Sequence, residues 1–193
     1  TTMKYEITMA FSDYVPNDTL GKIAAECMME VGAPKWETSD YELAKKFLNS
    51  YDPVTLETIK EDIVQTYGGD QLAKILERPL DDQVHPYVAG VHEYESGSTD
   101  VGDVGYEAPT LNLNVSTCCI GNVGHTWQMT AQAGSVLGHK GLLTAAKALA
   151  LSTIRTMESP EVMEAAKAEF VAKTGGVYHC PLPDDVKPPV GRY

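Results

Sequence analysis

Five histidines are the side chains of this sequence best suited to hold a metal or transfer a proton. They stand apart along the chain, at His85, His92, His125, His139 and His179. No two of them form HxH, HExxH or a pair four residues apart. Because a hydrolytic zinc site needs about three protein ligands, their spacing indicates no self-contained metal site.

His125 is the histidine whose surroundings point to chemistry. It follows an expected strand and the glycine-bounded turn 121–124, so we expect its imidazole to lie at the surface. Loops after strands are where α/β folds place ligand-binding groups. The alternative is a loop histidine that is hydrogen-bonded to backbone. His139 lies inside an expected helix and is interpreted as structural.

A second polar cluster lies at residues 97–100, where Ser98, Thr99 and Asp100 follow a glycine. Two hydroxyls and a carboxylate could bind a ligand, but these residue types also favour helix N-caps and Asx turns. Asp100 and Asp103 could form an acid–base pair, although acids three apart are common on solvated turns.

Four cysteines occur, at Cys27, Cys118, Cys119 and Cys180, and none forms a CxxC motif. Such sparse use fits a reducing cytoplasm, and no signal peptide is visible. Cys118 or Cys119 with His125 could form a thiol nucleophile. Neither has a basic neighbour or a helix N-terminus to lower its pKa, which disfavours this interpretation.

Composition limits the classes of function. The 193 residues contain 27 acids and 15 Lys or Arg, for a net charge of -12, and 43% are hydrophobic. A surface with this much negative charge repels phosphate backbones and anionic lipids. We therefore expect no nucleic-acid partner and no membrane partner. No run of about 18 apolar residues could span a membrane. The length suits one domain, or one large piece of a longer protein.

Periodicity predicts an α/β fold. Apolar residues alternate with other residues at 3–11 and again at 111–119, which is typical of half-buried strands. Helices are predicted at about 18–31, 40–48, 53–67, 71–77, 136–157 and 160–173. Residues 87–94 could be a strand, and 95–105 are expected to form a loop. The helix at 136–157 is apolar nearly all round, so we expect it to be well buried.

The first strand has no hairpin partner after it, because a break and a helix cap follow at 14–18. We therefore expect this strand to lie at an edge or detached, with its partner distant in the chain or outside it.

Three stretches together resemble one family. GSTDVGDVGYEAPT (97–110), GNVGHTWQMTAQAGS (121–135) and GHKGLLTAAKALALSTI (138–154) are similar, in this order and spacing, to the end of the M20-type zinc amidohydrolases. Among these the likeness is to the enzymes that act on aminobenzoyl-glutamate, and YHCPLP (178–183) fits them too.

This resemblance implies a two-metal α/β catalytic domain with an inserted lid used for dimerisation. Residues 1–16 would be the last lid strand, and 17–193 the carboxyl-terminal part of the catalytic domain. His125 would be the last metal ligand, and Ser98, Thr99 and Asp100 would lie near the substrate pocket.

The family's earlier metal-binding motif and its Glu-Glu pair have no counterpart here. In such enzymes a metal-bound water is the nucleophile and a glutamate moves its proton. The expected parent is thus a cytoplasmic zinc (or manganese) amidohydrolase, a homodimer or a heteromer with a partner subunit. It would cleave a small amide such as aminobenzoyl-glutamate or an N-acyl amino acid. We expect this chain alone to be inactive and to bind no zinc tightly. A non-catalytic binding or assembly module and a thiol enzyme using Cys119 remain the alternatives.

Overall fold

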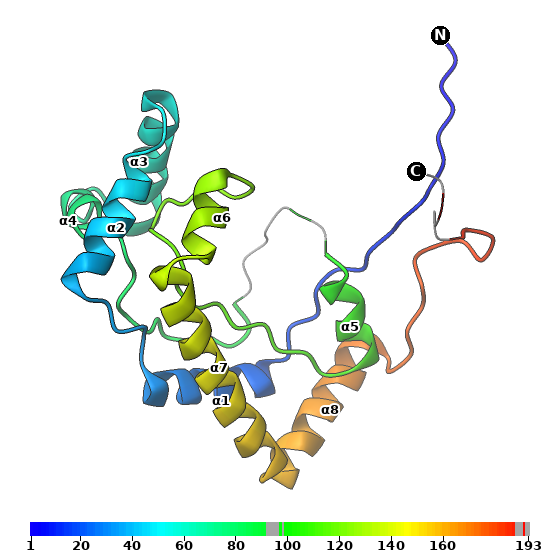
Figure 1. Ribbon diagram of the computed structural model, residues 1–193. Helices are drawn as coiled ribbons and strands as arrows, with labels where there is room; N and C mark the ends of the chain where they lie inside the picture. The colour runs from blue at the N-terminus through cyan, green and yellow to red at the C-terminus, as the bar shows by residue number, and fades with distance from the viewer. Residues whose placement is uncertain (92–96, 98, 188–190, 192–193) are drawn as a thin grey trace. The chain divides into compact units, whose positions relative to one another are not determined.

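The computed structural model describes residues 1–91, 97, 99–187 and 191. Within this part of the chain the regular structure is helical (Figure 1). The helices are α1 (Asp18–Val31), α2 (Thr38–Leu48), α3 (Pro53–Tyr67), α4 (Leu72–Glu77), α5 (Val101–Glu107), α6 (Trp127–Ala133), α7 (Val136–Met157) and α8 (Pro160–Thr174). None of these helices combines the length and apolarity needed to cross a membrane.

The predicted α/β fold is wrong, because the described residues contain no strand. The segment 3–11 carries the expected alternation but forms no ladder, and Met3 and Tyr5 are 83% and 82% exposed. A period of two makes a strand only where neighbouring backbone supplies hydrogen bonds. The expected last strand of the lid is therefore an extended segment that forms no strand ladder.

The other two predicted strands are wrong as well. Residues 111–119 form no ladder, and neither do 87–91, while 92–94 lie outside the described residues. Where a loop was expected, Val101–Glu107 forms α5. Gly102 and Gly105 make this helix fit, because a Cβ at Gly102 would overlap the Ser12 carbonyl and one at Gly105 would press on Val15. Packing outweighs the low helix propensity of glycine here.

The predictions of long helices are confirmed because their end signals are local. Asp52 caps α3 by accepting hydrogen bonds from the Val54 and Thr55 N–H groups, at 3.0 and 3.1 Å, and Pro53 takes the first helical position. Asn17 accepts from the Leu20 N–H at the start of α1, at 3.1 Å. Gly175 ends α8 in the left-handed conformation.

The chain forms two compact units. Unit 1 contains Thr1–Ile23, Tyr87–Asn112 and Arg155–Tyr193, and unit 2 contains Ala24–Pro86 and Leu113–Ile154. The predicted division into residues 1–16 and 17–193 follows domains of a longer protein and stays a prediction.

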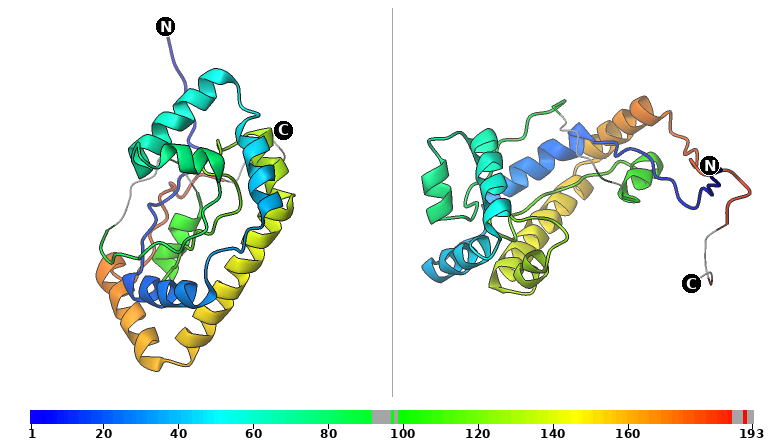
Figure 2. Two further views of the ribbon diagram at one scale, coloured as in Figure 1. Left: turned by 90° about the vertical axis from the view of Figure 1, so that its left-hand side faces the viewer. Right: turned by 90° about the horizontal axis from the view of Figure 1, so that it is seen from above.

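Unit 2 holds the main apolar core. In it α4 lies beside α2 and α3 (Figure 2). The core residues come from these three helices, from the loops around them and from α7: Tyr41, Ala44, Leu48, Tyr51, Ile59, Ile63, Ile75, Leu80, Cys119 and Leu137. The fully buried Asp40 ties α2 to α7. Its carboxylate accepts from the Glu37 N–H at 2.8 Å and from the Lys140 ammonium at 2.6 Å.

The expectation that 136–157 is well buried is wrong. Only one side of α7 is buried, at Leu137, Gly138, Gly141, Ala148 and Ser152. Leu142 and Leu143, next to Gly141, are 64% and 62% exposed. A helix that is apolar all round needs cover on both sides, and this chain supplies it on one side.

Replacement of Gly141 by Ala should destabilise the protein by about 1–3 kcal/mol. The added Cβ would overlap the Ser116 carbonyl oxygen and contact the Thr117 side chain, both in unit 2. Gly124→Ala is the matched control, because no atom lies within 4 Å of its added Cβ. Urea unfolding would measure both variants. Equal free energies of unfolding would show that the close approach at Gly141 is absent.

Candidate functional site

His125 lies in an exposed turn that leads into α6. It is the non-glycine residue with a positive φ, +58°, in the described part of the chain. A left-handed backbone costs a non-glycine residue roughly 1 kcal/mol, so the surroundings must hold it. The predicted exposure is confirmed, although no strand precedes the turn.

Thr126 fixes the far side of this turn. Its hydroxyl donates to the Val123 carbonyl at 2.8 Å and accepts from the Met129 N–H at 3.3 Å, which caps α6. Trp127, the first residue of α6, is 63% exposed and its ring lies 6.5 Å from that of Phe47. The imidazole of His125 is thus presented to solvent from a capped helix start.

A buried amide network fixes the near side of the turn. The Gln132 side chain is fully buried; its oxygen accepts from the Cys119 N–H at 2.8 Å, and its amide donates to Asn122 Oδ1 at 2.8 Å. The Tyr51 hydroxyl donates to the same Asn122 oxygen at 3.2 Å and accepts from the Val123 N–H at 2.9 Å. Residues 119–123 are therefore held at several points.

Sequence reasoning missed Tyr51, Asn122 and Gln132. The available signal was the pair Gln128 and Gln132, four residues apart on one face of a short helix. Both are buried, and long polar side chains are rarely buried unless they are hydrogen-bonded.

Of the predicted substrate residues, Thr99 and Asp100 lie just before α5 in unit 1. Ser98 is outside the described residues. Thr99 and Asp100 are exposed, and the Thr99 hydroxyl accepts from the Val101 N–H at 3.4 Å. Asp100 stands at the N-cap position but its carboxylate makes no capping bond. Thr99 and Asp100 belong to unit 1, whereas His125 belongs to unit 2.

The carboxylate of Asp103 is occupied by hydrogen bonds to residues distant in the sequence. Its carboxylate accepts from the Ser12 hydroxyl at 2.6 Å, from the Ser12 N–H at 3.2 Å and from the Tyr178 hydroxyl at 3.0 Å. These bonds, the Ser12 hydroxyl foremost, lower the pKa of Asp103. Asp103 therefore links α5 to Ser12 and Tyr178 within unit 1 and stays ionised near neutral pH.

The thiol-enzyme alternative finds no support in the geometry. Cys119 is buried, and burial raises the pKa of its thiol to about 12. Burial raises the pKa of Cys118 as well. A nucleophile must be a thiolate, and neither cysteine forms one near neutral pH.

The described residues do not by themselves fit a zinc site. Nowhere in that part of the chain do three His, Cys, Asp or Glu side chains gather as metal ligands. His125 can offer one imidazole, whereas a catalytic zinc takes about three protein ligands. Any metal held by His125 would need ligands from outside this set.

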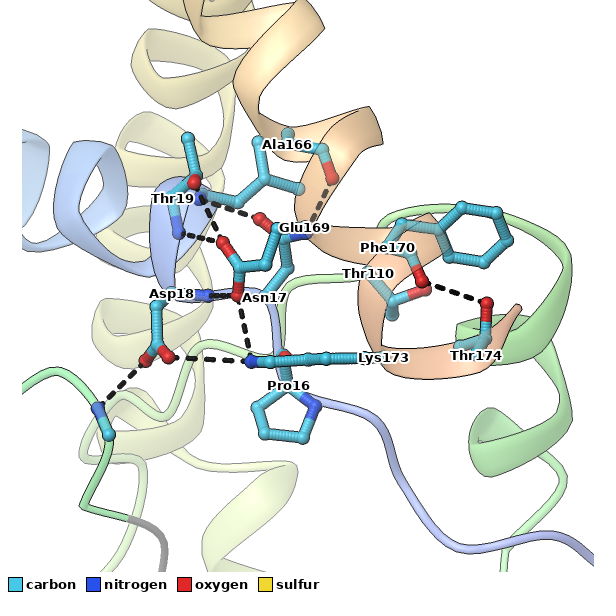
Figure 3. Close-up of polar contacts among 12 residues, drawn as sticks. Pro16, Asn17, Asp18, Thr19, Thr110, Ala166, Glu169, Phe170, Lys173 and Thr174 are labelled. Atoms are coloured by element: carbon cyan, nitrogen blue, oxygen red, sulfur yellow. Dashed lines mark hydrogen bonds and ion pairs between the residues drawn. The ribbon is translucent and has the colours of Figure 1, made fainter. Parts of the chain in front are cut away.

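A charged cluster in unit 1 caps a helix. Glu169 of α8 points at the start of α1 (Figure 3). Its carboxylate accepts from the Asp18 and Thr19 N–H groups at 2.6 and 2.9 Å. Lys173, one turn further along α8, donates to Glu169 at 2.8 Å and to the Pro16 carbonyl at 2.8 Å. A carboxylate satisfies the unpaired N–H groups there and complements the helix dipole.

This capping lowers two pKa values. Burial opposes the ionised form of Glu169, but Lys173, the Thr19 hydroxyl and the two N–H groups outweigh it and lower its pKa to about 2. The pKa of Asp18 is also lowered to about 2. The hydrogen bond from the Tyr87 hydroxyl contributes most to this shift, and the bond from the Gly90 N–H comes second. Both carboxylates are therefore ionised and occupied near neutral pH.

Beside this cluster, unit 1 has a shallow depression lined by Val15, Pro16, Asn17, Gly105, Pro109, Thr110, Phe170 and Lys173. It is partly open to solvent and has essentially no interior space for even a water molecule, whereas typical ligand pockets have roughly 300–1,000 Å³. It offers no room for a substrate.

Substitution of Gln132 by Leu should destabilise the protein by about 2–4 kcal/mol, since it leaves the buried Cys119 N–H without its partner. Gln65→Leu, at an exposed position of α3, should change the free energy of unfolding by less than about 0.5 kcal/mol. Chemical denaturation would compare the two. Similar small losses in both would mean that the network does not hold the turn.

Acidification should weaken the protein between pH 4.5 and pH 2. A carboxyl with a lowered folded-state pKa adds stability above its unfolded pKa, and that stability is lost as it is protonated. For Glu169 this amounts to roughly 2–3 kcal/mol. Urea unfolding of wild type and Glu169→Gln from pH 7 to pH 3 would check it. The variant should be weaker at pH 7 and less pH-dependent, whereas Glu164→Gln, exposed on the same helix, should follow the wild type.

Comparison with curated proteins finds a relative for almost the whole chain. The chain is 29% identical over 192 residues to a p-aminobenzoyl-glutamate hydrolase subunit of Escherichia coli (strain K12). The match covers 97% of this chain and 40% of that protein, so the chain spans about two fifths of its relative's length. No family model matches, and no solved structure matches significantly. The chain is thus related to a subunit of a hydrolase.

Proposed function

We propose that this chain is the carboxyl-terminal portion of a metal-dependent amidohydrolase that cleaves an amide such as p-aminobenzoyl-glutamate or an N-acyl amino acid. The observation that carries the proposal is the similarity to a p-aminobenzoyl-glutamate hydrolase subunit along 97% of the chain. The motifs at 97–110, 121–135 and 138–154, which resemble the end of the M20-type zinc amidohydrolases, support the same proposal.

In this proposal His125 is a metal ligand. Its support is physical: an exposed imidazole stands on a left-handed backbone that glycine would adopt more easily. Capping by Thr126 and the Gln132 network hold that backbone in place. Strain of this kind is found where a side chain must be presented in one direction. Ser98, Thr99 and Asp100 would contact the substrate.

The metal, zinc or manganese, would act in the complete protein. The described residues supply one candidate ligand, so the other ligands and the residue that moves the water proton would come from elsewhere. The chain alone is then inactive. The relative is named as a subunit, and we extend this to the present protein, which would work as a homodimer or with a partner subunit.

A non-catalytic assembly module is the second candidate function. It is favoured by the apolar residues that α7 leaves exposed. The two functions differ in whether this chain contributes a residue to hydrolysis.

Hydrolysis of p-aminobenzoyl-glutamate separates them. The test uses this chain, the separately produced part of the E. coli relative that the match does not cover, and the mixture of both with zinc. We expect release of p-aminobenzoate only from the mixture. His125→Gly should reduce that rate by about 100-fold or more without lowering the melting temperature, because glycine tolerates the left-handed backbone.

His139→Gly is the matched control for the loss of an imidazole, and its effect on the rate should follow its effect on folding, since it lies within α7. Turnover by the chain alone would contradict the missing-ligand argument. A mixture whose activity survives His125→Gly would leave the assembly module as the better function.

A further inference from the structure

One face of α7 is apolar and exposed. Leu142, Leu143, Ala146, Leu149 and Ala150, which we term the α7 face, are all exposed, with the leucines at 64%, 62% and 45%. Their spacing of one, three, three and one residues places them along one side of the helix. The α7 face lies within unit 2.

The opposite side of the same helix is already used. Leu137, Gly141, Ala148 and Ser152 are buried, and Gly141 allows close contact with the Ser116 backbone. The helix therefore has two packing sides, of which the chain covers one. Full burial of one exposed leucine is worth about 1.5–3 kcal/mol, and several neighbouring exposed leucines are typical of an interface.

Charge indicates what covers the α7 face. The chain has 27 acidic residues, but α7 has none among its 22 residues. The Lys140 ammonium is paired with Asp40, whereas Lys147 is exposed beside the α7 face. A second copy that packed helix against helix would bring like charges together. An apolar surface bordered by acidic side chains would complement α7.

Chain length indicates the source of that surface. The match leaves about three fifths of the relative's length without a counterpart here. We propose that the α7 face packs against this remaining part of the hydrolase polypeptide, whose contacting surface is apolar with an acidic border. The inference rests on the proposed function, and it assigns α7 as the surface on which the two parts assemble.

The test measures assembly of the unaltered 193-residue chain with the uncovered part of the E. coli relative. Both are produced separately and mixed, and light scattering and titration calorimetry follow the complex. We expect a one-to-one complex. The double variant Leu142→Glu with Leu149→Glu should weaken it by about 100-fold or more, since two buried contacts become buried charges.

Met29→Glu with Val54→Glu is the matched control. These apolar residues are 67% and 78% exposed in unit 2, on α1 and α3, and the same two charges there should change the affinity less than about threefold. Neither double variant should lower the melting temperature of the isolated chain by more than a few degrees, because all four positions are exposed.

Three results would overturn the inference. They are the absence of a complex, a complex that the α7 variant does not weaken, and a homodimer of this chain that the α7 variant disrupts. Hydrolysis is measured separately. A complex that assembles through α7 but does not hydrolyse p-aminobenzoyl-glutamate would refute the proposed function and leave the interface standing.

Discussion

The buried side-chain amide of Gln132 is the interaction on which the candidate site depends. It accepts from the Cys119 backbone and donates to Asn122, so it joins the chain before the turn to the helix after it. A side-chain amide offers both a donor and an acceptor, and both roles matter where no water can replace them. An apolar side chain of equal size would fill the space but would leave the Cys119 N–H without its partner. His125, with its left-handed backbone, lies between this network and the Thr126 cap of α6.

Three acidic side chains join separate elements inside the units by accepting hydrogen bonds. Asp40 links α2 to α7, Asp103 gathers two loops onto α5, and Glu169 caps α1. Burial alone would raise the pKa of Asp40, but the Glu37 N–H and the Lys140 ammonium hold it below its ordinary value. These three carboxylates are engaged as hydrogen-bond acceptors inside the units, which stabilises their ionised form.

Apolar surface remains uncovered in two kinds of segment. The extended residues 3–11 have the alternation of a strand but no ladder, and α7 has a second apolar side without a neighbour. Both sequence patterns are typical of segments that pack against other parts of a protein, but such packing needs a second apolar surface or strand to pack against. The same absence accounts for the error in fold class and for the error about the burial of α7.

The sequence by itself determined the helices with local end signals. Asn17, Asp52 with Pro53, and Gly175 act within a few residues, so the bounds of α1, α3 and α8 could be predicted closely. The exposure of His125 could also be predicted, from its glycine-bounded turn.

Tertiary structure decided the rest. It made a helix of the glycine-containing residues 101–107, because only small residues fit against Ser12 and Val15. It also brought Tyr51 to Asn122, 71 positions away, and Glu169 to Asp18, 151 positions away. Local sequence carries no record of such distant partners, because a hydrogen bond or a sheet depends on which surfaces meet and not on the pattern of one segment.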